Sequence, residues 1–140
     1  FGSLYALTSG TAFSPQYALT AIFKACNDDS YNFAEPLKEY GIKAEQMKKA
    51  LVENGFKIVY DKDLDVDVAD GFYFTFSYPG LTGEELLSEL AYYGISAISL
   101  GVCRSTRTEG ARACVSLVPN EMIPVFAQRV KKFHEDHPIK

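Results

Sequence analysis

The feature that most constrains the fold is a stretch of alternating residue types from Gly110 to Leu117, which reads GARACVSL. In a β-strand, successive side chains point to opposite sides. One side of this strand is then apolar and consists of Ala111, Ala113, Val115 and Leu117. The other side consists of Arg112, Cys114 and Ser116. The stretch therefore predicts a predominantly buried strand that carries a single cation on one face.

A guanidinium group on such a strand needs an anion, because an unpaired buried charge costs several kcal/mol. One interpretation of Arg112 is a bidentate clamp for a substrate carboxylate, a role that the planar fork of arginine suits better than lysine does. The other interpretation is a strand end that is paired with one of the acidic residues of this chain. The strand alone leaves both interpretations open.

The composition is that of a globular protein. The chain has 140 residues, of which 47% are hydrophobic and 14% aromatic, and this is enough for one packed core. The net charge of -4 and the scattered basic residues predict no nucleic-acid partner and no membrane partner. No apolar run is long enough to span a bilayer, and the chain does not open on a signal-peptide pattern.

The cysteines give an expectation about the cellular environment. Cys26, Cys103 and Cys114 are odd in number and far apart, so they form neither a CxxC pair nor a disulfide-dense framework. We therefore expect a reducing, cytoplasmic location. Because Phe1 is not an initiator methionine, we also expect the chain to be a fragment or a processed product.

The remaining periodicities predict four helices and four strands. Helices are expected at residues 14–26, 31–56, 83–93 and 120–135, and strands at residues 57–60, 71–77, 95–100 and 111–117. Ser14 and Pro15 are typical of a helix start, and Thr82 with Glu85 forms a capping box ahead of a helix that Gly94 ends. This order predicts an α/β (α+β) fold, in which a small, mostly antiparallel sheet and helices packed on one face make a two-layer sandwich.

Other groups of polar residues do not form a recognisable catalytic set. His134 and His137 lie in HEDHP near the C-terminus, one residue short of the spacing of a metal-binding helix, and a solvated tail is expected there. The acidic loop at residues 61–70 lacks the glycine and the closing glutamate of a calcium loop, so an ordinary acidic turn is favoured.

Taken in order, these elements resemble the C-terminal small domain of fold type I, pyridoxal-phosphate-dependent aminotransferases of classes I and II. The resemblance is carried by the aromatic strand GFYFTF, the helix GEELLSELAYYGI, the strand ARACVSL after a variable loop, and the terminal helix FAQRVKKF. The segment SPQYALTAIFKA is similar to the loop and helix that follow the cofactor lysine in this family. The long helical region after it is similar to the helix that links the large and small domains.

The resemblance implies a function for the parent protein. It would transfer an amino group between an amino acid and a 2-oxo acid, use pyridoxal 5'-phosphate and form a homodimer. Residues 1–30 would follow a large domain encoded upstream, and residues 31–140 would be the small domain. In this family the arginine of the strand after the variable loop binds the substrate α-carboxylate, and Arg112 matches it by position.

Two departures from the family pattern limit what this chain can do. None of its lysines has the family's serine-and-lysine context, so the resemblance implies no catalytic, cofactor-binding or metal-binding residue here, and the chain alone should be inactive. The loop at residues 8–14, TSGTAFS, lacks the arginine of dicarboxylate-selective members. An acidic substrate is therefore disfavoured unless Arg104 or Arg107 compensates, and these two are expected to face solvent.

Two alternatives stay open at this point. The chain is either a stand-alone α/β ligand-binding or regulatory module, in which Arg112 pairs internally, or part of a related pyridoxal-phosphate lyase, decarboxylase or synthase.

Overall fold

The structure is a computed structural model that describes residue 3, residues 10–68 and residues 71–139. The loop expected at residues 8–14 lies partly outside the described residues, and so does the end of the acidic loop at residues 61–70. The chain divides into two compact units, Phe1–Leu37 and Lys38–Lys140.

The first unit contains the helix α2 (Phe13–Asn27) and the 3-10 helix η1 (Glu35–Leu37). The expected helix is confirmed, but the N-cap is Ala12 rather than Ser14, and no side chain caps the helix. The backbone N–H groups of the first helical turn have no hydrogen-bond partner within the helix. Proline, which has no N–H, is therefore tolerated anywhere in this turn, and Pro15 does not determine the first residue of the helix. No residue of α2 is buried, and the exposed apolar side chains include Phe13, Tyr17, Leu19 and Phe23.

The second unit contains a four-stranded antiparallel sheet. In spatial order, its strands are β1 (Lys57–Ile58), β4 (Tyr73–Ser77), β6 (Gly110–Cys114) and β5 (Ile98–Ser99). The two long strands, β4 and β6, pair over their whole length, from Tyr73 opposite Cys114 to Ser77 opposite Gly110. A separate hairpin, β2 (Lys62–Asp63) and β3 (Val66–Asp67), lies within the stretch expected to be an acidic turn.

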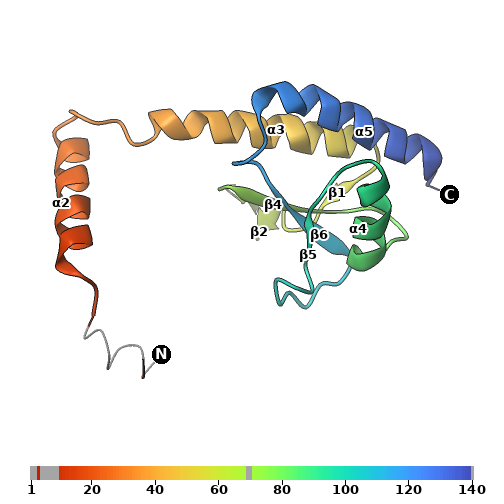
Figure 1. Ribbon diagram of the computed structural model, residues 1–140, viewed down its shortest axis with the longest axis horizontal. Helices are drawn as coiled ribbons and strands as arrows, with labels where there is room; N and C mark the ends of the chain where they lie inside the picture. The colour runs from red at the N-terminus through yellow and green to blue at the C-terminus, as the bar shows by residue number, and fades with distance from the viewer. Residues whose placement is uncertain (1–2, 4–9, 69–70, 140) are drawn as a thin grey trace. The chain divides into compact units, whose positions relative to one another are not determined.

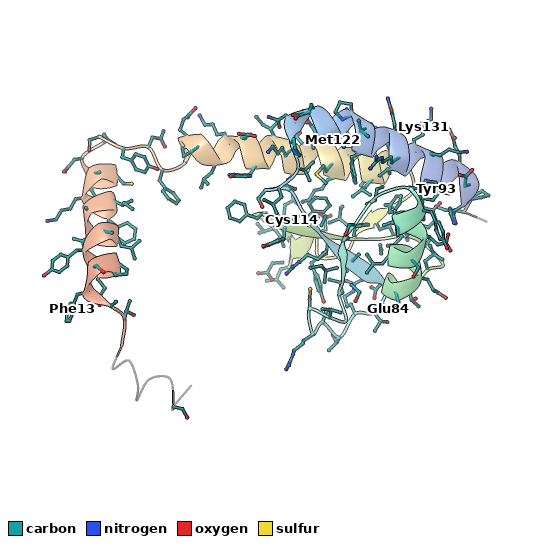
Figure 2. The ribbon with its side chains drawn as sticks, viewed as in Figure 1. Phe13, Glu84, Tyr93, Cys114, Met122 and Lys131 are labelled. Atoms are coloured by element: carbon teal, nitrogen blue, oxygen red, sulfur yellow. The ribbon has the colours of Figure 1, made fainter. Side chains whose placement is uncertain are left out.

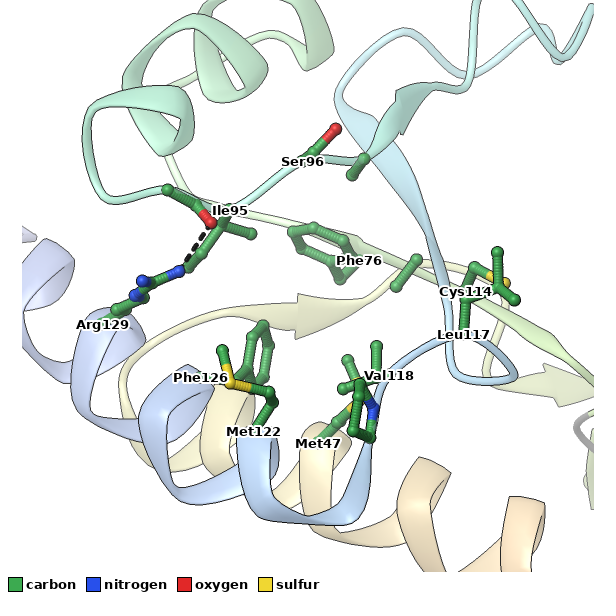
Figure 3. A pocket seen from close by; sticks show the side chains of 14 residues that line it. Met47, Phe76, Ile95, Ser96, Cys114, Leu117, Val118, Met122, Phe126 and Arg129 are labelled. Atoms are coloured by element: carbon green, nitrogen blue, oxygen red, sulfur yellow. Dashed lines mark hydrogen bonds between the residues drawn. The ribbon is translucent and has the colours of Figure 1, made fainter.

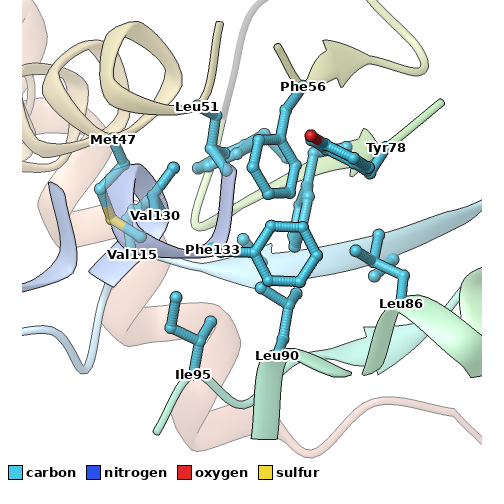
Figure 4. Close-up of a cluster of buried hydrophobic side chains, with 14 of the residues drawn as sticks. Met47, Leu51, Phe56, Tyr78, Leu86, Leu90, Ile95, Val115, Val130 and Phe133 are labelled. Carbon is cyan, nitrogen blue, oxygen red and sulfur yellow. The ribbon is translucent and has the colours of Figure 1, made fainter. Parts of the chain in front are cut away.

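Three helices pack against one face of this sheet: α3 (Lys38–Glu53), α4 (Gly83–Tyr92) and α5 (Ile123–Asp136), the last preceded by the 3-10 helix η2 (Asn120–Met122) (Figure 1). Alternate residues of the two long strands point into the core, namely Phe74, Phe76, Ala111 and Ala113. The helices contribute Met47, Leu51, Leu86, Leu90, Val130 and Phe133 (Figure 4). The predicted two-layer α/β (α+β) sandwich is therefore confirmed.

The local signals around α4 are also confirmed. The hydroxyl of Thr82 accepts a hydrogen bond from the backbone N–H of Glu85 at 3.3 Å, and the Glu85 carboxylate accepts one from the backbone N–H of Thr82 at 2.8 Å. The hydrogen bond from the backbone N–H of Thr82, and then one from its hydroxyl at 2.8 Å, lower the pKa of the Glu85 carboxyl. Gly94 follows the helix with a φ of 67°, a left-handed conformation that glycine adopts without a Cβ clash.

The strands are shorter than the alternation predicts. The regular pairing of β6 ends at Cys114, opposite the first residue of β4, Tyr73, and one further hydrogen bond joins the Val115 N–H to the Phe72 carbonyl at 2.9 Å. Leu117 is therefore not part of the apolar side and is 87% exposed. β5 covers two residues rather than the expected six at 95–100, and Ile95 packs into the core ahead of it.

The second helix begins later than the expected residue 31. The side-chain oxygen of Asn32 accepts hydrogen bonds from the backbone N–H groups of Ala34 and Glu35, which forms a local turn. Glu35–Leu37 then form the 3-10 helix η1, and the α-helix begins only at Lys38. Among the described helices, none is both long and apolar enough to cross a membrane.

Candidate functional site

Arg112 lies in the middle of β6, on the sheet face opposite the core. Its cross-strand neighbours are Thr75 on β4 and Ile98 on β5. The flanking residues Ala111 and Ala113 point into the core and are buried, whereas Arg112 is half-buried. The predicted alternation therefore places its cation as expected. Figure 2 draws the side chains around this sheet and labels Cys114, two residues further along the strand.

The guanidinium group of Arg112 stacks on an aromatic ring. Its central carbon lies 4.4 Å from the centroid of the Tyr73 ring, diagonally across the sheet. Within the described part of the chain, no carboxylate lies within ion-pair distance of this group. A stacked ring contacts one flat face of the guanidinium plane and leaves the N–H donors at its edge. Those donors are available for an anion that approaches the sheet face.

Cys114 lies on the same sheet face as Arg112. Its Sγ lies 3.2 Å from Oγ of Ser116, and this hydrogen bond is the main reason that the pKa of the thiol is lowered. Partial burial raises the pKa, while backbone N–H groups and the charge of Arg112 add to the lowering. The net effect favours the thiolate.

We expect the alkylation of Cys114 to have its pH midpoint below that of an ordinary thiol. In a chain that carries Cys26→Ser and Cys103→Ser, Ser116→Ala should shift this midpoint to higher pH, because the main cause of the lowering is removed. The measurement is the iodoacetamide reaction rate as a function of pH, followed by mass spectrometry. An unchanged midpoint would show that Ser116 does not stabilise the thiolate.

The two arginines of the loop before β6 differ in their contacts. Arg107 is exposed, but its Nε donates to Glu109 at 2.6 Å and its Nη1 donates to the Val59 carbonyl at 3.0 Å. A hydrogen bond from the backbone N–H of Glu109 itself and then the one from Arg107 lower the pKa of this carboxyl. Arg104 is exposed, with a φ of 60°. Arg107 is thus already engaged with a carboxylate of its own loop.

The two histidines do not lie on a solvated tail, and that expectation is wrong. Both are half-buried at the end of α5, where Nδ1 of His134 lies 2.8 Å from the hydroxyl of Tyr78. The same hydroxyl donates to the His137 carbonyl, and the His137 ring stacks on Phe133. The aromatic core therefore extends to the two histidines, and these contacts hold the C-terminal segment against the core. In the described residues, no group of histidine, cysteine and acidic side chains is arranged to hold a metal ion.

Sequence reasoning found Arg112 but not its stacking partner. The alternation along the strand predicts that Tyr73 faces outward. The sequence does not give the register of β4 and β6, and this register places Tyr73 diagonally opposite Arg112. No family model matches the chain, and no curated protein matches its sequence.

Proposed function

We propose that this chain is the small domain of a pyridoxal-phosphate-dependent aminotransferase, which transfers an amino group between an amino acid and a 2-oxo acid. In this proposal Arg112 binds the substrate α-carboxylate, and the partners of the chain are a large domain of the same protein and a second subunit. The three free cysteines support a cytoplasmic location.

The observation that carries the proposal is the state of Arg112. The guanidinium group of this half-buried residue stacks on Tyr73 and has no carboxylate of the described residues beside it, so its N–H donors are open to a carboxylate from outside this part of the chain. A carboxylate matches the spacing of two parallel N–H donors of a guanidinium, and such pairs are among the stronger hydrogen bonds in proteins. This match supports a bidentate carboxylate site at Arg112, the residue that corresponds by position to the carboxylate-binding arginine of the aminotransferase family.

The described residues do not themselves fit the cofactor. Among the described residues, Lys43 is the buried lysine, and its ammonium group lies 2.9 Å from the Glu39 carboxylate. The hydrogen bond from Lys43, and then its charge, lower the pKa of Glu39. A lysine held in this pair is not placed to bond an aldehyde, so the cofactor would belong to another part of the complete protein.

In the proposed reaction this chain positions the substrate. Arg112 would fix the carboxylate, so that the bonds at the α-carbon take a defined direction relative to the reacting group. Tyr73 would act as a positioning residue, because its ring limits the directions that the guanidinium group can take. No proton transfer is assigned to either residue.

The test of the proposal uses the complete protein that contains this chain. We expect that protein, and not residues 1–140 alone, to show the visible absorbance of lysine-linked pyridoxal phosphate. Supplied with a panel of amino acids and a 2-oxo acid acceptor, it should form the matching amino acid. A protein that binds no cofactor, or that releases ammonia or carbon dioxide without forming an amino acid, would contradict the assignment. The same absorbance from the 140-residue chain would show that it holds the cofactor lysine after all.

A further inference from the structure

An apolar pocket opens beside the sheet where the edge strand ends. β5 pairs only with Ala111 and Arg112, so Ala113 and Cys114 have no neighbour on that side. The segment 94–97 passes there without joining the sheet, and α5 closes the opposite side. The result is a cavity of about 230 Å³ (Figure 3).

Most of the pocket wall is apolar. Phe76 forms a buried part of it, and Phe126 of α5 is half-buried there. Met47 and Met122 also contribute, and methionine side chains adapt to ligands of irregular shape. A dry apolar cavity of about 150 Å³ is large enough for benzene. This pocket therefore has room for an aromatic ring with a short chain attached.

One charged residue borders this apolar space, and it is positive. Arg129 lines the pocket from α5, and its Nη1 donates to the Gly94 carbonyl at 2.8 Å, as Figure 3 shows. That bond uses one of five N–H donors of a guanidinium group. Among the described residues no carboxylate pairs with Arg129, and none lines the pocket. The carbonyl bond holds the cation at the pocket while leaving donors for a ligand.

We propose that this pocket binds a small carboxylate with an aromatic body, whose ring fills the apolar cavity and whose carboxylate pairs with Arg129. Arg112 does not line the pocket, so this is a second site that goes beyond the proposed function. A carboxylate is favoured because, among the described residues that line the pocket, Arg129 is the one cation and none is a carboxylate, and a planar guanidinium matches a planar carboxylate. The two sites are separable by mutation.

The first experiment measures the charge requirement. The 140-residue chain is titrated with 3-phenylpropionate and with the neutral 3-phenylpropan-1-ol, and binding is followed by NMR chemical shifts. We expect the carboxylate to bind at least roughly tenfold tighter than the alcohol, the size of one charge-assisted hydrogen bond. Arg129→Gln should remove this preference. Arg104→Gln is the matched control, because it deletes the same charge in an exposed loop, and it should keep the preference.

The second experiment locates the ligand. Bound 3-phenylpropionate should give intermolecular nuclear Overhauser effects to the methyl groups of Met47 and Met122, which line the pocket. Ala97→Phe places a ring in the cavity and should abolish both binding and these effects, and its near-UV circular dichroism reports whether the core is intact. Equal affinity for acid and alcohol, or the same Overhauser effects in an intact Ala97→Phe chain, would overturn the proposal. So would unchanged carboxylate affinity in Arg129→Gln.

Discussion

Replacing Phe133 by alanine is expected to lower the free energy of unfolding by about 3 to 5 kcal/mol. The side chain is fully buried at the centre of an aromatic cluster. Its ring centroid lies within 5.4 Å of the rings of Phe56, Tyr78, Tyr93 and His137. Alanine would leave a cavity that these rings cannot fill, because they come from separate elements of the fold. A loss of this size is a large share of the stability of an ordinary domain.

The measurement is urea unfolding of the 140-residue chain, with the wild type and the variant compared by circular dichroism. Phe72→Ala is the matched control, since it deletes the same ring where it is 45% exposed. That control should cost no more than about 1 kcal/mol. Equal losses for the two variants would show that the cluster around Phe133 is not the stabilising centre of the second unit.

The sequence predicted the core well because its periodicity reports burial directly. Phe74 and Phe76 alternate with outward residues, and Phe133 lies at helical spacing from Val130, so the residue pattern by itself indicates the buried side that the structure shows. The capping box at Thr82 is equally local, since its partners are three residues apart. Such signals need no knowledge of tertiary structure.

The features that sequence reasoning missed all depend on contacts between distant parts of the chain. β5 stops before it covers the whole edge of β6, and the pocket beside Arg129 lies next to the part of that edge that β5 leaves unpaired. The burial of His134 depends on Tyr78, which lies 56 residues earlier. The stacking of Arg112 on Tyr73 likewise depends on the register of two strands. Residue patterns within one element carry no information about such pairs.

Arg112→Lys in the complete protein is expected to lower kcat/KM for the amino acid substrate roughly 30- to 900-fold. This corresponds to a loss of about 2 to 4 kcal/mol of transition-state stabilisation. Lysine keeps the positive charge, but it offers a single ammonium group in place of two parallel N–H donors. It also loses the flat stacking on Tyr73 that holds the guanidinium group in place. The charge alone therefore does not replace the geometry.

Two measurements separate carboxylate binding from a general structural effect of this substitution. The first is kcat/KM for the amino acid compared with kcat/KM for the amine that lacks its carboxyl group. The amine cannot use the clamp, so its already low value should be the same in the wild type and in Arg112→Lys. The second is urea unfolding of the 140-residue chain, in which the variant should lose little stability because Arg112 is only half-buried and has no ion pair among the described residues. If kcat/KM for the amino acid stays unchanged, or if acid and amine lose activity equally, Arg112 does not bind the α-carboxylate.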